Sequence, residues 1–157
     1  MSHLQTLERE GWIPRPLEEV FSFFGDAGNL EKITPPWLNF QILSPRPIQM
    51  AVGAKIVYQI RWHGAPMRWT TEIVEWNPPF GFVDVQLKGP YRRWHHSHSF
   101  ARQRDGTLMK DRVGYELPFG WLGRIAHALT VRKTLAEIFD YRLRVIGQIF
   151  SEQKSNA

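Results

Sequence analysis

Two side chains in the second half of the sequence have the types and spacing needed for proton transfer. His96 and Asp111 each lie in a run of alternating residues typical of a β-strand, and a turn around Arg104-Asp105-Gly106 separates the two runs. If the loop spans Arg102 to Asp105, His96 lies opposite Asp111, with Cβ atoms about 5 Å apart. The imidazole would carry the proton and the carboxylate would fix its tautomer. The same contact would equally serve as a structural pair, so we assign no catalytic residue and keep these two as candidates.

The same stretch has the spacing of a metal-chelating motif. His96-Ser97-His98 places two imidazoles on one face of a strand, and Asp111 would complete a set of three ligands. Two histidines at this spacing are common by chance, and His95 shows that the stretch is simply rich in histidine. We therefore expect no metal and no cofactor.

Further polar residues could share this site. Asp84 and Gln86 alternate with apolar neighbours, so either set can face inward, and the sequence leaves this choice open. If Phe82, Asp84 and Gln86 face inward, they join Arg92 and the histidine–aspartate pair at one polar end. A mostly apolar pocket with a few convergent polar groups is typical of a ligand site.

Antiparallel strands are the elements that would position these residues. The clearest signal is the alternation of Ile56, Tyr58, Ile60 and Trp62 with more polar neighbours. Proline, glycine and asparagine clusters separate the other runs. We predict strands at Leu4–Trp12, Phe40–Leu43, Lys55–Trp62, Met67–Ile73, Phe80–Lys88, Tyr91–Ala101 and Thr107–Leu117.

Helical periodicity occurs near both ends of the sequence. Leu17–Phe24 predicts a short helix, and Asp26–Ile33 predicts a second one with Asp26 as its N-cap. From Trp121 to Phe150 the apolar period is 3.6, which predicts one helix about 45 Å long. We expect the polar tail Ser151–Ala157 to fray. Strands followed by a segregated long helix define an α+β fold.

The composition bounds what the chain can be. Its 157 residues suit a single domain over residues 1–157. The sequence has no cysteine, which fits a reducing compartment, and we expect a cytoplasmic location. No run of about 18 uncharged apolar residues could span a membrane, and the first ten residues do not resemble a secretory signal.

The net charge of +5 comes mostly from arginine spread along the chain. One group of basic residues is denser than the rest: Lys88, Arg92, Arg93, Arg102, Arg104, Lys110 and Arg112. A solvated basic face is the simplest interpretation, and attraction to an anionic ligand, a membrane surface or nucleic acid is the alternative. Since no basic helix with interleaved aromatic residues occurs, we expect no nucleic-acid partner, while transient contact with a membrane surface stays open. The oligomeric state is not indicated.

Three segments, in this order, resemble the SRPBCC superfamily, which is also described as START-like or birch-allergen-like. Ile13–Phe24 looks like the family's opening P-x-x-x-V-F-x-F motif. Gly89–Phe100 and Asp111–Gly120 resemble a bacterial, uncharacterised, polyketide-cyclase-like subgroup. The resemblance spans about Leu4 to Phe150. It implies the helix-grip fold: a seven-stranded curved antiparallel sheet, two short helices after the first strand, and a long C-terminal helix over the concave face.

The resemblance also implies a deep apolar cavity between sheet and helix, in which relatives bind lipids, sterols, quinones or polyketides. We predict that inward-facing side chains of the strands and the long helix form its wall, with methionines making the wall adaptable. The predicted ligand-binding residues are Ile56, Tyr58, Ile60, Trp62, Met67, Trp69, Ile73, Phe82, Gln86, Arg92, Trp94, His96, His98, Met109, Asp111, Val113, Tyr115, Ile125 and Leu129.

A binding or carrier protein without enzymatic activity is the function we expect. Its ligand would be a small apolar or amphipathic molecule of the lipid, quinone, polyketide or aromatic type. The alternative is a cyclase or dehydratase that uses His96 and Asp111 as an acid–base pair, and the second alternative is an interaction protein with a basic surface. The sequence has neither a glycine-rich phosphate loop nor a G-x-S-x-G motif.

Overall fold

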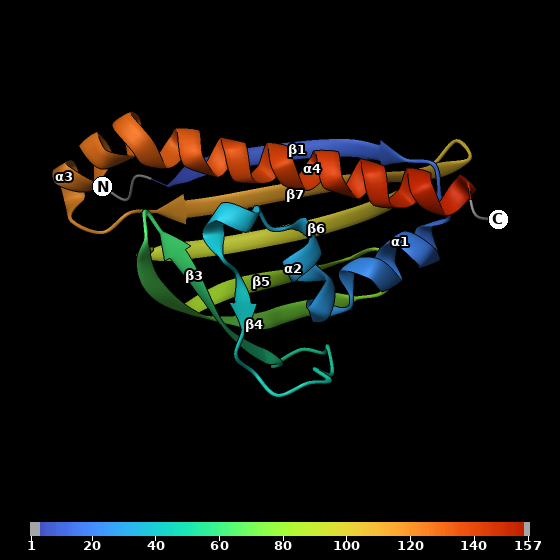
Figure 1. The fold of residues 1–157 in the computed structure, drawn as a ribbon, viewed down its shortest axis with the longest axis horizontal. Coiled ribbons are helices and arrows are strands. Elements are labelled where there is room, and N and C mark those ends of the chain that lie inside the picture. The colour runs from blue at the N-terminus through green and yellow to red at the C-terminus, as the bar shows by residue number, and fades with distance from the viewer. Residues whose placement is uncertain (1–3, 156–157) are drawn as a thin grey trace.

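One antiparallel sheet forms the body of the computed structural model, which describes residues 4–155 (Figure 1). Within these residues it has the seven antiparallel strands that were predicted, and they lie in the order β1-β7-β6-β5-β4-β3-β2. Sequential hairpins build most of the sheet, and the N-terminal strand pairs with the last one. The strands are β1 Gln5–Ile13, β2 Gln41–Ile42, β3 Lys55–Trp62, β4 Ala65–Asn77, β5 Gly81–Lys88, β6 Arg93–Gln103 and β7 Gly106–Glu116.

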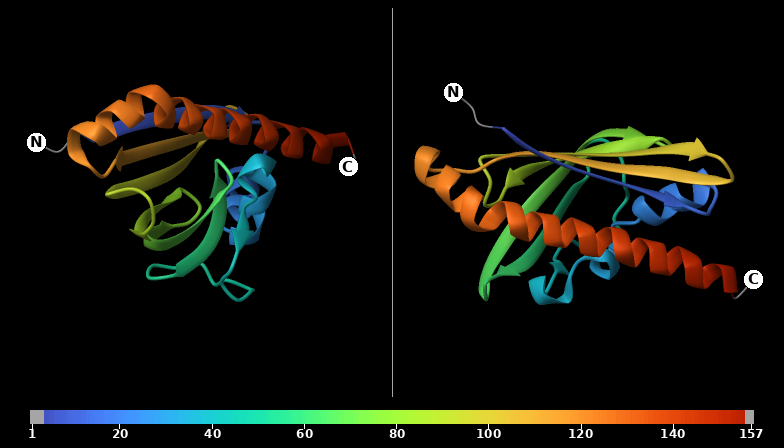
Figure 2. Two further views of the ribbon diagram at one scale, coloured as in Figure 1. Left: turned by 60° about the vertical axis from the view of Figure 1, so that its left-hand side comes forward. Right: turned by 90° about the horizontal axis from the view of Figure 1, so that it is seen from above.

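The helices lie on one side of this curved sheet. Figure 2 shows the long C-terminal helix running across the strands, with the short N-terminal helices beside its far end. The predicted second helix is divided: Asp26 caps a 3-10 turn by accepting a hydrogen bond from the Gly28 amide at 2.8 Å, and α2 follows it. The helical segments are α1 Leu17–Phe24, η1 Ala27–Asn29, α2 Leu30–Ile33, η2 Pro36–Leu38, α3 Gly120–Ala126, η3 His127–Val131 and α4 Arg132–Ser155.

Two apolar clusters attach the long helix to the sheet. One joins the C-terminal part of α4 to α1, and the side chains of Phe24, Phe100 and Ile146 lie in it. The other joins the start of α4 to the strands, and Leu135 and Phe139 lie in it. The apolar face of α4 therefore packs at both of its ends, which holds the helix over the concave face of the sheet.

The hairpin between β6 and β7 is tighter than predicted, so the predicted register is wrong. Gln103 pairs with Gly106, and Arg104 adopts a positive φ of 57° in the two-residue turn between them. His98, rather than His96, therefore lies opposite Asp111. The turn is two residues shorter than assumed, and a shift of two keeps every side chain on its face of the sheet. The histidines and Asp111 still share the inner face.

The long helix also differs from the expected single regular element. A π-helical turn at His127–Val131 interrupts it and rotates the apolar face, because an extra residue enters that turn. Ile125 and Leu129 consequently project into solvent, and Leu129 is 72% exposed. At the other end α4 continues to Ser155, where a frayed tail was expected; residues 156–157 lie outside the described range.

Candidate functional site

An internal cavity of about 160 Å³ lies between the concave face of the sheet, α4 and the short helices. On the same measure a single water needs only about 10–15 Å³, so this space is large enough for an organic molecule. Most of the wall is aromatic or aliphatic, and Phe40, Ile138 and Phe139 contribute to it besides the predicted residues. The predicted residues that line it are Ile56, Tyr58, Ile60, Trp62, Trp69, Ile73, Phe82, Trp94, His96 and His98.

Four predicted wall residues do not line the cavity, because their side chains pack in the apolar clusters next to it. Met109 and Val113 are buried in the two apolar clusters. Tyr115 is also buried, and its hydroxyl lies 2.7 Å from His127 Nε2 beneath the start of the long helix. Met67 packs against the cluster around Trp69 without reaching the cavity.

Other predicted wall residues are held elsewhere by polar contacts or by exposure. The Gln86 side chain bonds to the Tyr91 backbone, donating to its carbonyl at 2.7 Å and accepting from its amide at 3.2 Å. Arg92 is exposed and pairs with Glu116 at 3.2 Å. Ile125 and Leu129 face solvent, as described above. Asp111 lies behind the two histidines rather than on the wall.

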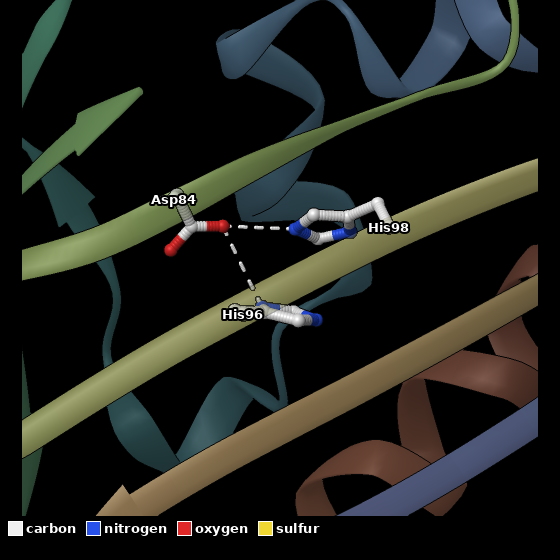
Figure 3. Close-up of side chains that lie close together, drawn as sticks. All are labelled: Asp84, His96 and His98. Carbon is white, nitrogen blue, oxygen red and sulfur yellow. Dashed lines mark hydrogen bonds and ion pairs between the residues drawn. The ribbon is translucent and has the colours of Figure 1, made fainter. Parts of the chain in front are cut away.

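The open question about Asp84 is answered by its place on the cavity wall. β5 presents Phe82 and Asp84 inward, and Figure 3 shows the Asp84 carboxylate directed toward the histidines of β6. Its Oδ2 lies 2.9 Å from His98 Nε2 and 3.6 Å from His96 Nδ1. The polar end of the cavity therefore contains Asp84, His96 and His98, and neither Gln86 nor Arg92 lines it.

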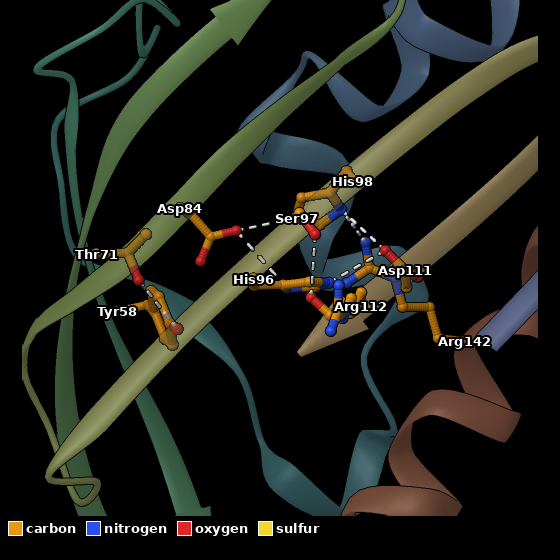
Figure 4. A network of polar contacts seen from close by, with 9 residues as sticks. All are labelled: Tyr58, Thr71, Asp84, His96, Ser97, His98, Asp111, Arg112 and Arg142. Carbon is orange, nitrogen blue, oxygen red and sulfur yellow. Dashed lines mark hydrogen bonds and ion pairs between the residues drawn. The ribbon is translucent and has the colours of Figure 1, made fainter. Parts of the chain in front are cut away.

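A second carboxylate lies on the far side of the same two imidazoles (Figure 4). Asp111 Oδ1 is 3.1 Å from His96 Nε2 and 3.0 Å from His98 Nδ1. His96 thus contacts Asp111 as the sequence predicted, although through a diagonal pair of positions. Aromatic contacts hold both rings further. His98 stacks on Phe82 at 4.1 Å between ring centroids, and His96 meets the Phe139 ring edge-on at 5.4 Å.

Arg142 of α4 completes this polar group and was not predicted from the sequence. Its Nε lies 3.5 Å from Asp111 Oδ2, and its guanidinium lies over the rings of Phe24 and Phe139. Its spacing in the sequence could have predicted it: Arg142 comes three residues after Phe139 and four before Ile146, so it lies on the same buried face of the helix as these two apolar residues. We refer to the five side chains together as the polar cluster: Asp84, His96, His98, Asp111 and Arg142.

The pKa values within the polar cluster follow from burial and charge together. Burial alone raises the pKa of Asp111, but the Arg142 charge and the imidazole N–H groups outweigh it and hold this pKa well below its ordinary value. The pKa of Asp84 is lowered in the same way, because its hydrogen bond with His98 and the nearby positive charges together outweigh burial. Both carboxylates are therefore ionised at neutral pH.

The two histidines are shifted in opposite directions. Burial and the nearby His98 charge lower the pKa of His96. Burial also tends to lower the pKa of His98, but its bonds to Asp111 and Asp84 raise it overall. Carboxylates only accept hydrogen bonds, so His98 donates from both nitrogens and carries a positive charge. Its Nδ1 proton goes to Asp111, which makes the 3.4 Å approach of Arg142 Nη2 a packing contact.

A curved antiparallel sheet, a long helix across its concave face and a cavity between them define a helix-grip domain. The family model described as polyketide cyclase / dehydrase and lipid transport matches residues 13–139, and the chain belongs to this family. This confirms the resemblance seen in the sequence. A search of curated proteins found no match.

Solved structures share the fold at low sequence identity. TTHA0849 from Thermus thermophilus is 20% identical with a TM-score of 0.70, covering 95% of this chain and 99% of that chain. A protein from Arthrobacter aurescens is 15% identical with a TM-score of 0.72, covering 94% and 86%. Ginseng major latex-like protein 151 from Panax ginseng is 12% identical with a TM-score of 0.65, covering 94% and 97%. At these identities the likeness concerns the fold alone.

None of the helices within residues 4–155 combines the length and the apolar character that crossing a bilayer requires.

Proposed function

We propose that the chain binds one small apolar or amphipathic molecule, of the lipid, quinone, polyketide or aromatic type, inside this cavity. The observation that carries the proposal is an internal space whose walls are mostly aromatic and aliphatic, with a cluster of buried polar side chains on β5 and β6. Membership of a family whose description includes lipid transport and polyketide cyclases supports the same class of ligand.

The polar end favours a ligand with a hydrogen-bond donor. In the metal-free protein His96 donates from Nε2 to Asp111, which leaves its Nδ1 as an acceptor beside the Asp84 carboxylate. Both groups line the cavity. A hydroxyl group placed there would donate to either acceptor, while the apolar body of the ligand would contact the aromatic wall. This geometry orients the molecule in one direction.

A substitution that fills the cavity tests the proposal. Ile138 lines the cavity from α4 and is only half buried, so Ile138→Trp adds bulk without forcing it into the packed core. The control is Val74→Trp, which adds the same kind of bulk on the exposed face of β4. With N-phenyl-1-naphthylamine as a fluorescent probe, we expect Ile138→Trp to weaken binding tenfold or more. Equal affinity in both folded variants, or no binding to the wild type, would contradict the proposal.

A complementary measurement can identify the natural ligand. Native mass spectrometry of the protein purified from its own host would detect a co-purifying molecule and give its mass. The same molecule would then serve as the substrate for testing the enzymatic alternative. In that alternative His96 is the group that meets the ligand, and Asp111 positions its ring. Turnover abolished in His96→Ala and in Asp111→Asn would favour the enzyme, and unchanged turnover would exclude this acid–base mechanism.

The hypothesis of a basic interaction surface loses support from the ion pairs on that face. Arg102 pairs with Glu18, Lys110 with Glu10 at 3.2 Å, and Arg112 with Glu8 at 3.1 Å. Each of these glutamates offsets a positive charge that a polyanion would need. The face is therefore closer to neutral than the sequence suggested.

A specific surface instead favours contact with an anionic membrane as a second candidate function. Apolar side chains at the start of the C-terminal helix are exposed, namely Phe119, Trp121, Leu122, Ile125 and Leu129. Between Leu117 and Ala136 the sequence has no acidic residue, and Arg132 and Lys133 follow the apolar group. Exposed aromatic and apolar side chains beside cations are typical of segments that enter the bilayer interface.

Sedimentation with lipid vesicles tests this surface. We expect binding to vesicles containing phosphatidylglycerol, with several-fold weaker binding to phosphatidylcholine alone and at high salt. The variant Trp121→Ser/Leu129→Ser should lose most of this binding. Leu87→Ser, which removes an exposed apolar side chain from β5, should retain it. Equal loss in both variants would contradict a specific role for the exposed apolar group from Phe119 to Leu129.

A further inference from the structure

We propose that Asp84, His96 and His98 form a binding site for a divalent transition-metal ion at the polar end of the cavity, with zinc as the first candidate. This departs from the sequence analysis, which favoured no metal and considered Asp111 as the third ligand. The inference stands apart from the proposed ligand binding, because metal binding is measured without any organic molecule. Either proposal can fail while the other holds.

Three donor atoms lie at distances that a metal requires (Figure 3). Asp84 Oδ2 is 2.9 Å from His98 Nε2 and 3.6 Å from His96 Nδ1, and all three atoms lie within 4.8 Å of one another. Ligands bound about 2.0–2.1 Å from a tetrahedral zinc ion lie about 3.3 Å apart. The two short distances bracket this value, so the side chains need to move by only a few tenths of an ångström there.

Asp111 provides the support that metal-binding histidines typically have. Its Oδ1 lies 3.1 Å from His96 Nε2 and 3.0 Å from His98 Nδ1, the two ring nitrogens directed away from Asp84. A histidine that binds a metal nearly always donates its other N–H to a carboxylate or carbonyl. One carboxylate oxygen does this for both rings, and Arg142 lies against the other oxygen of Asp111. The lone pairs of both rings are thereby directed toward Asp84.

A proton on His98 satisfies this arrangement only in part. The proton supplies the hydrogen bond from His98 to Asp84. His96 Nδ1, however, lies 3.6 Å from the same carboxylate, and because its N–H is on Nε2, both Nδ1 and the carboxylate can only accept a hydrogen bond there. The described residues place no hydrogen-bond donor at His96 Nδ1. A cation between the three atoms resolves the conflict, since it accepts electron pairs from all of them.

Charge and access favour the same conclusion. A metal ion would take the place of the His98 proton: with both imidazoles neutral, as metal ligands are, Asp84 and Asp111 against Arg142 leave one negative charge in a buried place for the cation to balance. The three proposed ligands line the cavity, so the remaining coordination position is open to it. Two imidazoles and one carboxylate with an open position are found in catalytic zinc sites and in non-haem iron sites. A metal bound here would be able to polarise an oxygen atom of a ligand in the cavity.

Direct titration tests the site. The protein, without a polyhistidine tag, is freed of metal with EDTA, dialysed, and titrated with ZnCl₂ by calorimetry and with CoCl₂ by visible absorption. We expect one equivalent of zinc, and a cobalt spectrum typical of four- or five-coordination. Asp84→Asn and His98→Gln should each weaken zinc binding 100-fold or more, and Asp111→Asn should weaken it about 10–100-fold without changing the stoichiometry.

The matched control is His95→Gln, which removes an exposed histidine from the same strand. It should bind zinc like the wild type. Unchanged zinc affinity in Asp84→Asn and His98→Gln, or loss in His95→Gln alone, would overturn the proposal, as would an absence of zinc binding to the wild type. If a ligand variant does not fold, the cobalt-loaded wild type decides by NMR. Two slowly exchanging, paramagnetically shifted imidazole N–H signals are expected, and fewer would contradict two histidine ligands.

Discussion

Replacing Arg142 tests whether charge balance holds the polar cluster together. Asp111 is 3% exposed and the Arg142 side chain 11%, so the substitution Arg142→Met leaves a carboxylate in a nearly dry environment. At 3.5 Å and an effective dielectric constant of about 20, the lost attraction is about 4–5 kcal/mol. Breaking a buried ion pair from one side typically costs about 3–5 kcal/mol. Because both histidines still donate to Asp111, we expect a loss of about 3 kcal/mol, at the lower end of that range.

A double-mutant cycle separates the ion pair from other effects of the substitution. Asp111→Asn removes the charge from the other side, and we expect a loss of similar size. The double variant Arg142→Met/Asp111→Asn should be about 2 kcal/mol more stable than the sum of the single losses predicts, since neither charge is then left alone. Urea unfolding in EDTA gives the free energies, and the m-value should not change. In thermal unfolding Arg142→Met should melt about 6–12 °C lower.

The control lies on the same helix, two residues earlier. Asp140 pairs with Arg9 at 2.6 Å, but Asp140 is 61% exposed. Solvent screens this pair, so Asp140→Asn should cost less than about 1 kcal/mol. Equal losses from Arg142→Met and Asp140→Asn, or strict additivity in the cycle, would refute the argument that burial makes the inner pair decisive.

Three further predictions concern a close backbone approach, an exposed helical glycine and a buried hydroxyl. An added Cβ at Gly81 would lie 2.3 Å from the His98 carbonyl oxygen. Gly81→Ala should therefore lower the free energy of unfolding by about 1–3 kcal/mol, as overpacking of a core does, and should weaken metal or ligand binding near His98. Gly147→Ala, at an exposed helical position with open space, should instead stabilise the fold by about 0.5–1 kcal/mol in the same urea assay. Thr107→Val removes a 2.8 Å hydrogen bond to the Arg15 carbonyl and should cost about 1–3 kcal/mol in calorimetry, whereas no change would show that water replaces it.

Alternation predicted the faces of the strands well because it does not depend on the register. The hairpin prediction was wrong by two residues, yet His96, His98 and Asp111 fell on the correct face. A one-residue error would have placed Asp111 on the opposite face from the two histidines. The same reasoning could not place Asp84, since Phe82 and Val83 are both buried and β5 therefore lacks the contrast on which alternation depends.

Contacts between elements that are distant in the sequence could not be predicted from local sequence patterns. Arg142 meets Asp111 from a helix that begins after the last strand, and only the packing of α4 across the sheet brings them together. The π-turn at His127–Val131 is a second case: Ile125 and Leu129 are exposed beside it, and the only trace of it in the sequence is the wider spacing from Leu129 to Leu135, where Arg132 and Lys133 take the positions expected to be apolar. Helical periodicity predicts that an element exists, whereas the angle at which it meets the sheet depends on tertiary contacts.

The proposals for ligand and metal meet at the same atoms, which makes them physically dependent when both hold. Asp84 and His96 present acceptors to the cavity in the metal-free protein. A bound metal would consume these acceptors, so the polar end would then prefer a ligand oxygen that donates an electron pair rather than a proton. A ligand with a carbonyl or carboxylate group should therefore bind more tightly with zinc present, and should gain more affinity from zinc than a simple alcohol does. Affinities for both ligand types that do not change with zinc would show that the polar end does not contact the ligand.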